Sequence, residues 1–361
     1  MKIALIADSH FGARNDSQIF LNYFQKFYDE IFFPYLKDNG ITTMVHFGDV
    51  VDRRKFINFV SLNEMKSMFF DRALKEEIDT HILIGNHDCY YKTTNVINSI
   101  NELVGDYDNI TIYSEPKEMI FQGPAGNDTH VLMIPWINPT NYAKTMRMVK
   151  KSKSPIVFGH LEIRGIEMYN GVINEVGVEG KVFSDFEFVA SGHFHHKSSL
   201  NNIHYLGNPY PMTWNDYNDP RGFHIFDTSD KSMEFVRNPY TIFNKLWYND
   251  EDVKSVKELL NFDSDKFKDL YIKVIVTKKT NPYWFDLYLD KLYNSEIENI
   301  QIVDDHFNVD EENEDDITDE LDDTITILTK YIDDMDLNIN KKKLDNLMRS
   351  LYNEAINISD T

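Results

Sequence analysis

The chain has 361 residues, of which 42% are hydrophobic, enough for a large core and for two or three domains. Its net charge of −22 excludes indiscriminate attachment to nucleic acid, and its single cysteine, Cys89, excludes a disulfide scaffold. The apolar run Ile3–Ala7 is far too short for a membrane span or a signal peptide, so we expect a cytoplasmic protein without membrane contact.

Short apolar runs alternate with longer helical patterns over the first two-thirds of the chain, and this alternation predicts an α/β architecture. In chain order, strands are predicted at Lys2–Ala7, Thr43–Phe47, His81–Ile84, Val131–Pro135, Ile156–Gly159 and Phe188–Ser191. Helices are predicted at Ser17–Lys37, Asn58–Lys75 and Pro139–Lys151. Further strand-like runs favour two packed sheets over one: Ile203–Leu206, Gly222–Phe226 and Met233–Val236.

The pattern changes near residue 240, which divides the chain into four predicted parts. Residues 1–240 form the α/β domain, and residues 241–304 form a small α+β domain, with strands at Tyr271–Thr277 and Ile297–Asp304 around a helix at Pro282–Asn294. Residues 305–323 are predicted to be an acidic linker, because Asp304–Asp323 holds 12 acidic residues and no Lys or Arg. Residues 324–361 show two helical patterns, at Thr324–Met335 and Lys341–Asn357.

Two local basic clusters remain in this acidic chain. The first is Arg53, Arg54 and Lys55, and the second is Lys144, Arg147, Lys150, Lys151 and Lys153. Each is either a contact for nucleic acid or an ordinary solvated face, and the pattern alone favours neither.

Five short motifs rich in Asp, His and Asn each follow a predicted strand: Asp8-Ser9-His10, Gly48-Asp49-Val50-Val51-Asp52, Gly85-Asn86-His87-Asp88, Gly159-His160 and Gly192-His193-Phe194-His195. Loops at one edge of a sheet converge in space, and residues i and i+2 of an extended segment point the same way. Asp8 and His10 can therefore face one site. Each motif alone is explained by turn or capping chemistry, but five in this order predict a shared site.

Carboxylate, imidazole and amide ligands without thiolate suit Mn²⁺, with Fe, Zn or Mg²⁺ as alternatives. An Asp that bridges two ions about 3.5–4 Å apart would let them clamp the attacking and leaving oxygens of a phosphoryl displacement. The chain has no G-x-x-x-x-G-K or G-x-G-x-x-G loop, so we expect no ATP site of its own.

The motifs resemble those of the calcineurin-like metallophosphoesterases. Their G-D-V-V-D, G-N-H-D and G-H-F-H forms are most similar to the Mre-eleven/SbcD branch, the nuclease subunits of DNA double-strand-break repair complexes. The resemblance continues through Tyr205-Leu206-Gly207 and Asp219-Pro220-Arg221-Gly222-Phe223. It implies a sandwich of two mixed β-sheets flanked by helices, a small capping domain at residues 241–304 that contacts DNA, and a C-terminal helical segment.

The resemblance also implies a role for each site residue. One ion would bind Asp8, His10 and His195; the second would bind Asn86, His160 and His193. Asp49 would bridge the two ions, and His87 would act as a general acid or stabilise the transition state instead of binding metal. Asp52 and Asp88 would act on the ligands and not on a metal. Some family members carry His at the position of Asp52, which leaves its direct role open.

By the same resemblance, the chain would be a Mn²⁺-dependent DNA nuclease of double-strand-break repair and recombination. It would be a 3′-to-5′ exonuclease on duplex ends and an endonuclease on single strands, and would work as a homodimer bound to an SMC-like ABC ATPase of the SbcC type. One alternative is a calcineurin-like phosphatase or phosphodiesterase with a non-DNA substrate, because Gly48–Arg53 also fits that form. Another is a non-enzymatic scaffold for the ATPase, which lost ligands would indicate; every expected ligand is present.

Two partner surfaces are predicted. The helical segments Asn58–Lys75 and Thr93–Val104 would form the homodimer through Met65, Met68 and Phe69, although these residues could equally pack on the sheet of the same chain. Lys341–Asn357 would dock on the ATPase or, alternatively, pack on the catalytic domain. Its apolar residues follow a 3, 1, 3, 1, 3, 1 spacing: Leu344, Leu347, Met348, Leu351, Tyr352, Ala355 and Ile356.

Overall fold

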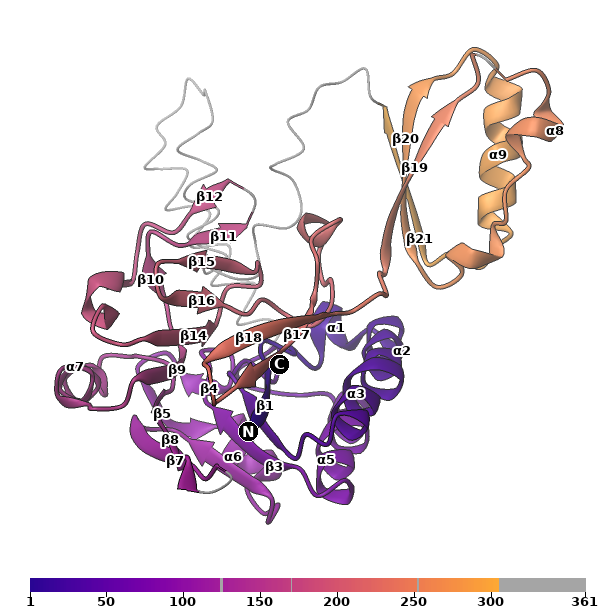
Figure 1. Ribbon diagram of the computed structural model, residues 1–361. Coiled ribbons are helices and arrows are strands. Elements are labelled where there is room, and N and C mark those ends of the chain that lie inside the picture. The colour runs from indigo at the N-terminus through magenta and orange to yellow at the C-terminus, as the bar shows by residue number, and fades with distance from the viewer. Residues whose placement is uncertain (124–125, 170, 252, 305–361) are drawn as a thin grey trace, which may run out of the picture.

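The structure is a computed structural model that describes residues 1–123, 126–169, 171–251 and 253–304 (Figure 1). The predicted acidic linker at 305–323 and the predicted helical segment at 324–361 lie outside these described residues. Within the described part of the chain, no helix combines the length and the apolar character that crossing a membrane requires.

Two six-stranded mixed sheets form the body of the molecule (Figure 1). The first has the order β18 (Ser232–Arg237), β17 (Gly222–Asp227), β1 (Lys2–Ile6), β2 (Thr43–His46), β3 (Asp79–Leu83) and β6 (Ile110–Tyr113). The second has the order β15 (Ser198–Leu200), β16 (Ile203–Tyr205), β14 (Phe188–Gly192), β9 (Ile156–His160), β8 (Thr129–Ile134) and β7 (Lys117–Phe121). Both have a parallel centre. Antiparallel pairs complete both edges of the second sheet and the β17–β18 edge of the first, whereas β6 at the other edge of the first sheet pairs parallel with β3.

The two sheets pack face to face over a shared core. Ile3 and Leu5 of β1 reach into this core and meet Phe158 of the second sheet. Ala4 and Ile6, the alternate residues of β1, point to the other face and join the cluster under the helices. Because both faces of β1 are covered, its residues are almost all apolar. The expected fold class, an α/β sandwich of two mixed sheets flanked by helices, is confirmed.

Helices cover the outer face of each sheet. On the first sheet lie α2 (Gln18–Phe27), the π-helical turn η1 (Tyr28–Phe32), α3 (Phe33–Asp38), α4 (Phe59–Met65), the π-helical turn η2 (Lys66–Phe70), α5 (Asp71–Lys75) and α6 (Ser99–Val104). On the second lie α7 (Tyr142–Lys151) and the 3₁₀ turn η4 (Gly180–Phe183). The three helices predicted from the sequence are present; Ser17–Lys37 and Asn58–Lys75 each contain a π-helical turn that periodicity did not indicate.

The helix predicted at Thr93–Val104 is wrong in its first half. Residues 94–98 form the strand β5 (Thr94–Asn98), which pairs with β4 (Cys89–Tyr91). β-branched residues favour the strand, and the side chain of Asn98 then accepts the backbone N–H of Asn101 at 2.9 Å. This cap starts α6 at Ser99.

The apolar residues assigned to a dimer surface are also corrected. Met65, Met68 and Phe69 are buried in the core between the helices and the first sheet. The same segments expose other large apolar side chains: Phe59 is 86% exposed and Val96 is 72% exposed. Any apolar surface of these segments is therefore formed by residues other than Met65, Met68 and Phe69.

Several short elements complete the body. They are α1 (Ala13–Asp16), the 3₁₀ turn η5 (Trp214–Asp216), and the paired strands β10 (Ile163–Arg164) with β13 (Val178–Glu179) and β11 (Glu167–Tyr169) with β12 (Val172–Ile173).

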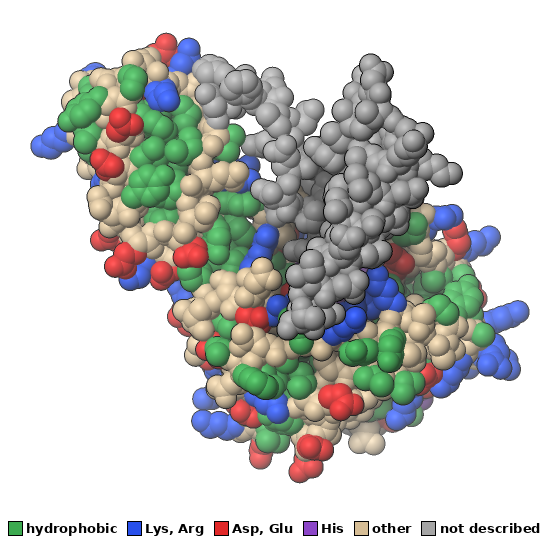
Figure 2. Space-filling model, turned by 180° about the vertical axis from the view of Figure 1, so that it is seen from behind, with side chains coloured by type: hydrophobic (Ala, Val, Ile, Leu, Met, Phe, Trp, Pro, Cys, Tyr) green, Lys and Arg blue, Asp and Glu red, His purple; other side chains and the backbone are tan. Residues whose placement is uncertain are grey.

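A smaller unit follows the body and extends from it (Figure 1). Its parallel sheet has the order β19 (Phe243–Asn249), β20 (Tyr271–Lys278) and β21 (Asn299–Asp304). Beside it lie α8 (Val256–Leu259), the 3₁₀ turn η6 (Asp265–Phe267) and α9 (Pro282–Tyr293), and α9 packs on the sheet through its own apolar cluster. Trp247 and Tyr283 of this unit are exposed, and Figure 2 shows apolar side chains gathered on one of its faces.

Candidate metal centre

The five motifs lie at the carboxyl ends of β1, β2, β3, β9 and β14, either in the last residues of the strand, as for Gly159 and His160, or in the loop that follows. Backbone bonds hold the first two loops together: Asp8 N–H donates to Gly48 O at 3.1 Å, and His10 N–H donates to Asp49 O at 3.1 Å. The carboxylate of Asp8 in turn accepts the backbone N–H of His193 at 3.0 Å. Loops from two separate sheets therefore form one buried cluster.

One group of potential ligands consists of Asp8, His10 and His195, whose ligand atoms all lie within 4.8 Å of one another. All three residues are buried. The Nε2 atoms of His10 and His195 are only 3.0 Å apart. Two imidazole nitrogens at this distance need a shared proton or a cation between them, because two lone pairs repel.

A second group consists of Asp49, His160 and His193, again with ligand atoms within 4.8 Å of one another. Asn86 belongs with it, because its Oδ1 lies 2.9 Å from a ring nitrogen of His160 and 2.9 Å from one of His193. All four side chains are buried.

The carboxylate of Asp49 reaches both groups. Its Oδ2 lies 3.4 Å from Nε2 of His160 and 4.0 Å from Nε2 of His10. A Cβ added at Gly85 would overlap the Asp49 side chain, so only glycine leaves room for the carboxylate there. Asp49 is thus the described carboxylate best placed between the two groups.

The donor set fits divalent metal ions. Nε2 of His193 is buried and has no hydrogen-bond partner among the described residues, so a ligand for it is missing. The set contains carboxylate, imidazole and amide donors and no thiolate, which suits Mn²⁺, Fe, Zn or Mg²⁺.

Burial and mutual charge set the protonation of these groups. Burial raises the pKa of Asp8 to about 7. Burial acts in the same direction on Asp49, but the imidazoles of His160 and His87 outweigh it and hold the pKa of Asp49 well below its usual value. Burial lowers the pKa of His193 far below its usual value, which leaves the ring neutral and able to bind a metal.

His160 differs from the other imidazoles. Burial would lower its pKa, but the charge of Asp49, its hydrogen bond to Asp49 and the charge of Asp8 raise the pKa of His160 to about 9. A bound cation would replace this proton as the partner of both carboxylates.

Asp88 holds the two central loops together. Its Oδ2 accepts the backbone N–H groups of Asp49 at 2.8 Å and Gly85 at 2.9 Å. Its Oδ1 accepts those of Val50 at 2.9 Å and Val51 at 3.3 Å. Burial and the charge of Asp49 nevertheless raise the pKa of Asp88 to about 6. Asp88 therefore contacts the backbone of the predicted ligand Asp49 and of the loop that carries Asn86.

Several residues of the centre have left-handed backbone conformations. The φ angles are 53° at Asp8, 44° at His10, 52° at Asp49 and 94° at His193. Each costs about 1–3 kcal/mol for a residue other than glycine, so the surrounding contacts must impose them. Strain of this kind concentrates at functional sites, and no pattern in the sequence predicted it.

A buried hydrogen-bonded chain under the centre supplies part of that restraint. Nδ1 of His46 accepts the N–H of Gly48 at 3.2 Å, which places the ring proton on Nε2. Nε2 lies 2.8 Å from Oγ of Ser9, and this hydroxyl lies 3.0 Å from the hydroxyl of Tyr28. No role was assigned to His46 from the sequence, where its only distinguishing feature is its position two residues before Gly48.

His87 belongs to neither ligand group among the described residues. Its backbone N–H donates to Oδ1 of Asp49 at 2.7 Å, and its Nδ1 lies 2.5 Å from the carbonyl oxygen of Asp52. The carbonyl can only accept, so Nδ1 carries a proton and Nε2 is the atom free for other chemistry. Oδ1 of Asp52 lies 3.4 Å from Nδ1 of His10, so Asp52 orients one of the predicted ligands.

The motif that follows the histidines also supports the centre. The buried guanidinium of Arg221 donates to the carbonyl oxygen of His195 and to Oδ1 of Asn208, and is paired with Asp216 at 2.6 Å. Nδ1 of His196, a residue to which the sequence assigned no role, lies 2.7 Å from Oδ2 of Asp219. The sequence indicated Arg221 only as part of a motif that resembles the family, because its contact with His195 spans 26 residues.

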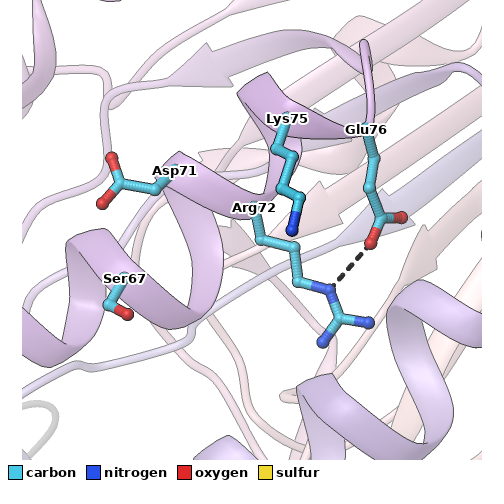
Figure 3. A pocket seen from close by; sticks show the side chains of 5 residues that line it. All are labelled: Ser67, Asp71, Arg72, Lys75 and Glu76. Carbon is cyan, nitrogen blue, oxygen red and sulfur yellow. Dashed lines mark hydrogen bonds and ion pairs between the residues drawn. The ribbon is translucent and has the colours of Figure 1, made fainter.

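A surface pocket of about 380 Å³ lies elsewhere, on η2 and α5 (Figure 3). It is lined by Ser67, Asp71, Arg72, Lys75 and Glu76. Within this pocket Arg72 and Glu76 form an ion pair, with Nε of Arg72 2.9 Å from Oε1 of Glu76. The pocket contains none of the predicted site residues and does not belong to the centre.

Replacing Asp88 by Asn tests the role of its carboxylate. The amide retains one acceptor but turns an NH₂ group toward backbone donors, so we expect Mn²⁺ affinity to fall about 10–100-fold. Isothermal titration calorimetry measures this, and Asp230→Asn, an exposed site, is the matched control. Unchanged affinity in Asp88→Asn would contradict the assignment.

Comparison with known proteins agrees with this geometry. Residues 1–220, which include all five motifs, match the family described as calcineurin-like phosphoesterase. Exonuclease subunit 1 of Enterobacteria phage T4 is 32% identical to this chain over 301 residues, which cover 82% of this chain and 83% of that protein.

Two solved structures are more distant. An archaeal phosphodiesterase is 14% identical, covers 66% of this chain and 100% of its own, and has a TM-score of 0.30. A glutamine-dependent NAD⁺ synthetase from Acinetobacter baumannii is 10% identical, covers 98% of this chain and 72% of its own, and has a TM-score of 0.26. Neither structure supports an assignment at these TM-scores, so the family match and the phage relative identify the family. The chain belongs to the calcineurin-like phosphoesterases, metal-dependent hydrolases of phosphoester bonds, and is similar to their Mre-eleven/SbcD branch.

Proposed function

We propose that this chain is a Mn²⁺-dependent DNA nuclease. The observation that supports this most is the pair of ligand groups joined by the carboxylate of Asp49, in a chain 32% identical to a phage exonuclease subunit. The proposed activities are 3′-to-5′ exonuclease action on duplex ends and endonuclease action on single strands, in double-strand-break repair and recombination. The proposed cellular location is the cytoplasm.

Two divalent ions would be held by the two groups, where they would supply Lewis-acid activation of the scissile phosphate and a nucleophile at neutral pH. Asp8, His10 and His195 would hold one ion. Asn86, His160 and His193 would hold the other, and Asp49 would contact both. Mn²⁺ is proposed for this mixed oxygen and nitrogen donor set, with Mg²⁺ or another divalent ion as the alternative.

His87 is proposed as the catalytic residue. Its bonds to Asp49 and to the Asp52 carbonyl oxygen fix its position and place a proton on Nδ1. In the imidazolium form, which also carries a proton on Nε2, Nε2 would donate that proton to the leaving oxygen of the substrate and the ring would keep its proton on Nδ1.

A nuclease assay tests the proposed function. Labelled duplex and single-stranded oligonucleotides are incubated with Mn²⁺ or Mg²⁺, beside p-nitrophenyl phosphate and bis-p-nitrophenyl phosphate. Cutting of DNA that Asp49→Asn abolishes supports the proposal. Hydrolysis of the small phosphoesters without any cutting of DNA would favour the alternative, a phosphatase or phosphodiesterase with another substrate.

His87→Ala separates chemistry from metal binding. Loss of a general acid lowers the rate of DNA cutting by about 10²–10⁴-fold. Calorimetry should still detect two bound Mn²⁺ ions, because His87 belongs to neither ligand group. Asp49→Asn is the comparison, since one carboxylate that serves both ions should weaken both. Loss of metal in His87→Ala would show that the role is misassigned.

A homodimer is proposed through the segments 58–75 and 93–104. The dimer is supported by the exposed side chains of Phe59, Val60 and Val96, because the methionines of these segments are buried. Replacing Phe59 and Val96 by Ser should convert a dimer to a monomer, because both residues are exposed and the fold does not depend on them. Light scattering at micromolar concentration measures the mass, with Tyr283→Ser in the smaller unit as control. A monomeric unsubstituted protein would rule out a stable dimer.

The segment 324–361 is proposed to dock on an SMC-like ABC ATPase of the SbcC type. A short amphipathic helix gains order by placing its apolar stripe in a partner's groove. Deleting 324–361 should leave Mn²⁺-dependent cutting of single strands intact and abolish co-purification with the ATPase. Leu347→Asp should reproduce the loss, whereas Asp345→Ala, off the stripe, should not. Unchanged binding by the truncated chain would favour packing on the catalytic domain instead.

A further inference from the structure

A second pocket, of about 170 Å³, adjoins the metal centre. One wall continues the loop of Asp49 and Asp52 and runs from Val51 to Ile57. The other wall begins two residues after Asp88, at Tyr90. The loop after β2 thus contributes to both the centre and this pocket, and β4, β5 and α6 complete the pocket.

The pocket carries aromatic and basic side chains beside the acidic Glu102, and its Arg53 is also paired with Asp16. Phe56 is 63% exposed and Tyr90 is 39% exposed, so both rings have surface available to a ligand. The guanidinium of Arg53 lies 4.5 Å from the centre of the Phe56 ring, and Nζ of Lys55 lies 5.9 Å from that of Tyr90. Cations beside exposed rings match the stacked bases and phosphates of a single strand.

Two polar groups of the pocket lack partners. Arg54 and Ser99 both line it, and both Nη1 of Arg54 and Oγ of Ser99 are buried without a hydrogen-bond partner among the described residues. A buried donor left unsatisfied costs about 1–3 kcal/mol, so a ligand that supplies an acceptor is favoured. The backbone N–H of Ser99 donates to the carbonyl oxygen of Asp88 at 2.8 Å, which ties this polar end of the pocket to the centre.

We propose that this pocket binds one base of a single-stranded nucleic-acid substrate, with Arg54 and Ser99 bonding to the polar edge of the base and Tyr90 and Phe56 providing aromatic surface for its face. The proposal rests on the proposed nuclease function and adds to it a recognition site for an unstacked base. A base in this pocket would hold the neighbouring phosphodiester beside Asp49 and His87.

Other occupants fit less well. A free phosphate would satisfy Arg54 but leave the apolar wall of Ile97 and Leu103 without a partner. An apolar side chain from a second copy of the chain would leave Nη1 of Arg54 unsatisfied. Drug-sized ligands occupy pockets of about 300–1,000 Å³, which exceeds this one. A single planar ring with carbonyl acceptors meets the size, the apolar walls and the buried donor together.

The test compares the double variant Arg54→Gln/Ser99→Ala with the unsubstituted protein on two single-stranded oligonucleotides, one normal and one with abasic sites. Loss of the two hydrogen bonds to the edge of the base corresponds to about a tenfold effect. We therefore expect the Kd for the normal oligonucleotide, measured by fluorescence anisotropy in EDTA, to rise about tenfold. On the abasic oligonucleotide the substitutions should have no effect, as in a double-mutant cycle.

Arg147→Gln, which removes the same charge from the exposed face of α7, is the control for general electrostatics. Hydrolysis of bis-p-nitrophenyl phosphate, which has no base, reports whether the metal centre of the double variant is intact. Anisotropy in EDTA does not require catalysis, so base binding without DNA cutting would refute the nuclease function and leave the pocket assignment standing.

Three results would overturn the proposal. The first is an unchanged Kd for the normal oligonucleotide. The second is an equal loss on the abasic oligonucleotide, which would identify a phosphate contact. The third is conversion of a dimer to a monomer by the double variant in light scattering, which would assign the pocket to an interface between two copies of the chain.

Discussion

Four backbone N–H groups converge on the carboxylate of Asp88, and the arrangement of the centre depends on this interaction. Two of them belong to Val50 and Val51 in the loop after β2, one to Asp49 itself, and one to Gly85 in the loop after β3. A carboxylate buried without such donors would be unstable, and loops without such an acceptor would leave their N–H groups unpaired. The bond network therefore fixes the loop of Asp49 against the loop of Asn86.

The restraint is needed because the ligands occupy unfavourable states. Asp8, His10 and Asp49 have left-handed φ angles, and burial raises the pKa of Asp8 to about 7 while neighbouring imidazoles lower that of Asp49. Strain and buried charge of this kind persist only where many other contacts oppose relaxation. His46 and Arg221 supply such contacts, one beneath the Asp8 and Asp49 loops and one at the backbone of His195.

The same loops serve two purposes. After Asp52 the chain turns away from the ligands and forms the basic rim at Arg53, and after Asp88 it forms the strand that carries Tyr90. The metal centre and the second pocket are thus coupled by short stretches of backbone. A substrate held in the pocket would be positioned relative to the centre by the fold itself.

The sequence by itself determined the class of fold and the residue types that are candidates for a metal centre. Ligand types are local properties, so short motifs after apolar runs indicated a shared site, the resemblance of those motifs implied Asp8, Asp49, Asn86 and the four histidines as its ligands, and the alternation of strands and helices predicted the α/β fold. The tertiary structure decided everything that depends on distant partners. Periodicity identified the helix of Met65 but not which of its faces meets the sheet, and β19 was not recognised because the polar residues Asn244 and Lys245 interrupt its apolar run. Arg221 and His46 acquire their roles only through contacts with loops distant in the sequence, because hydrogen bonds and burial arise between segments that folding brings together.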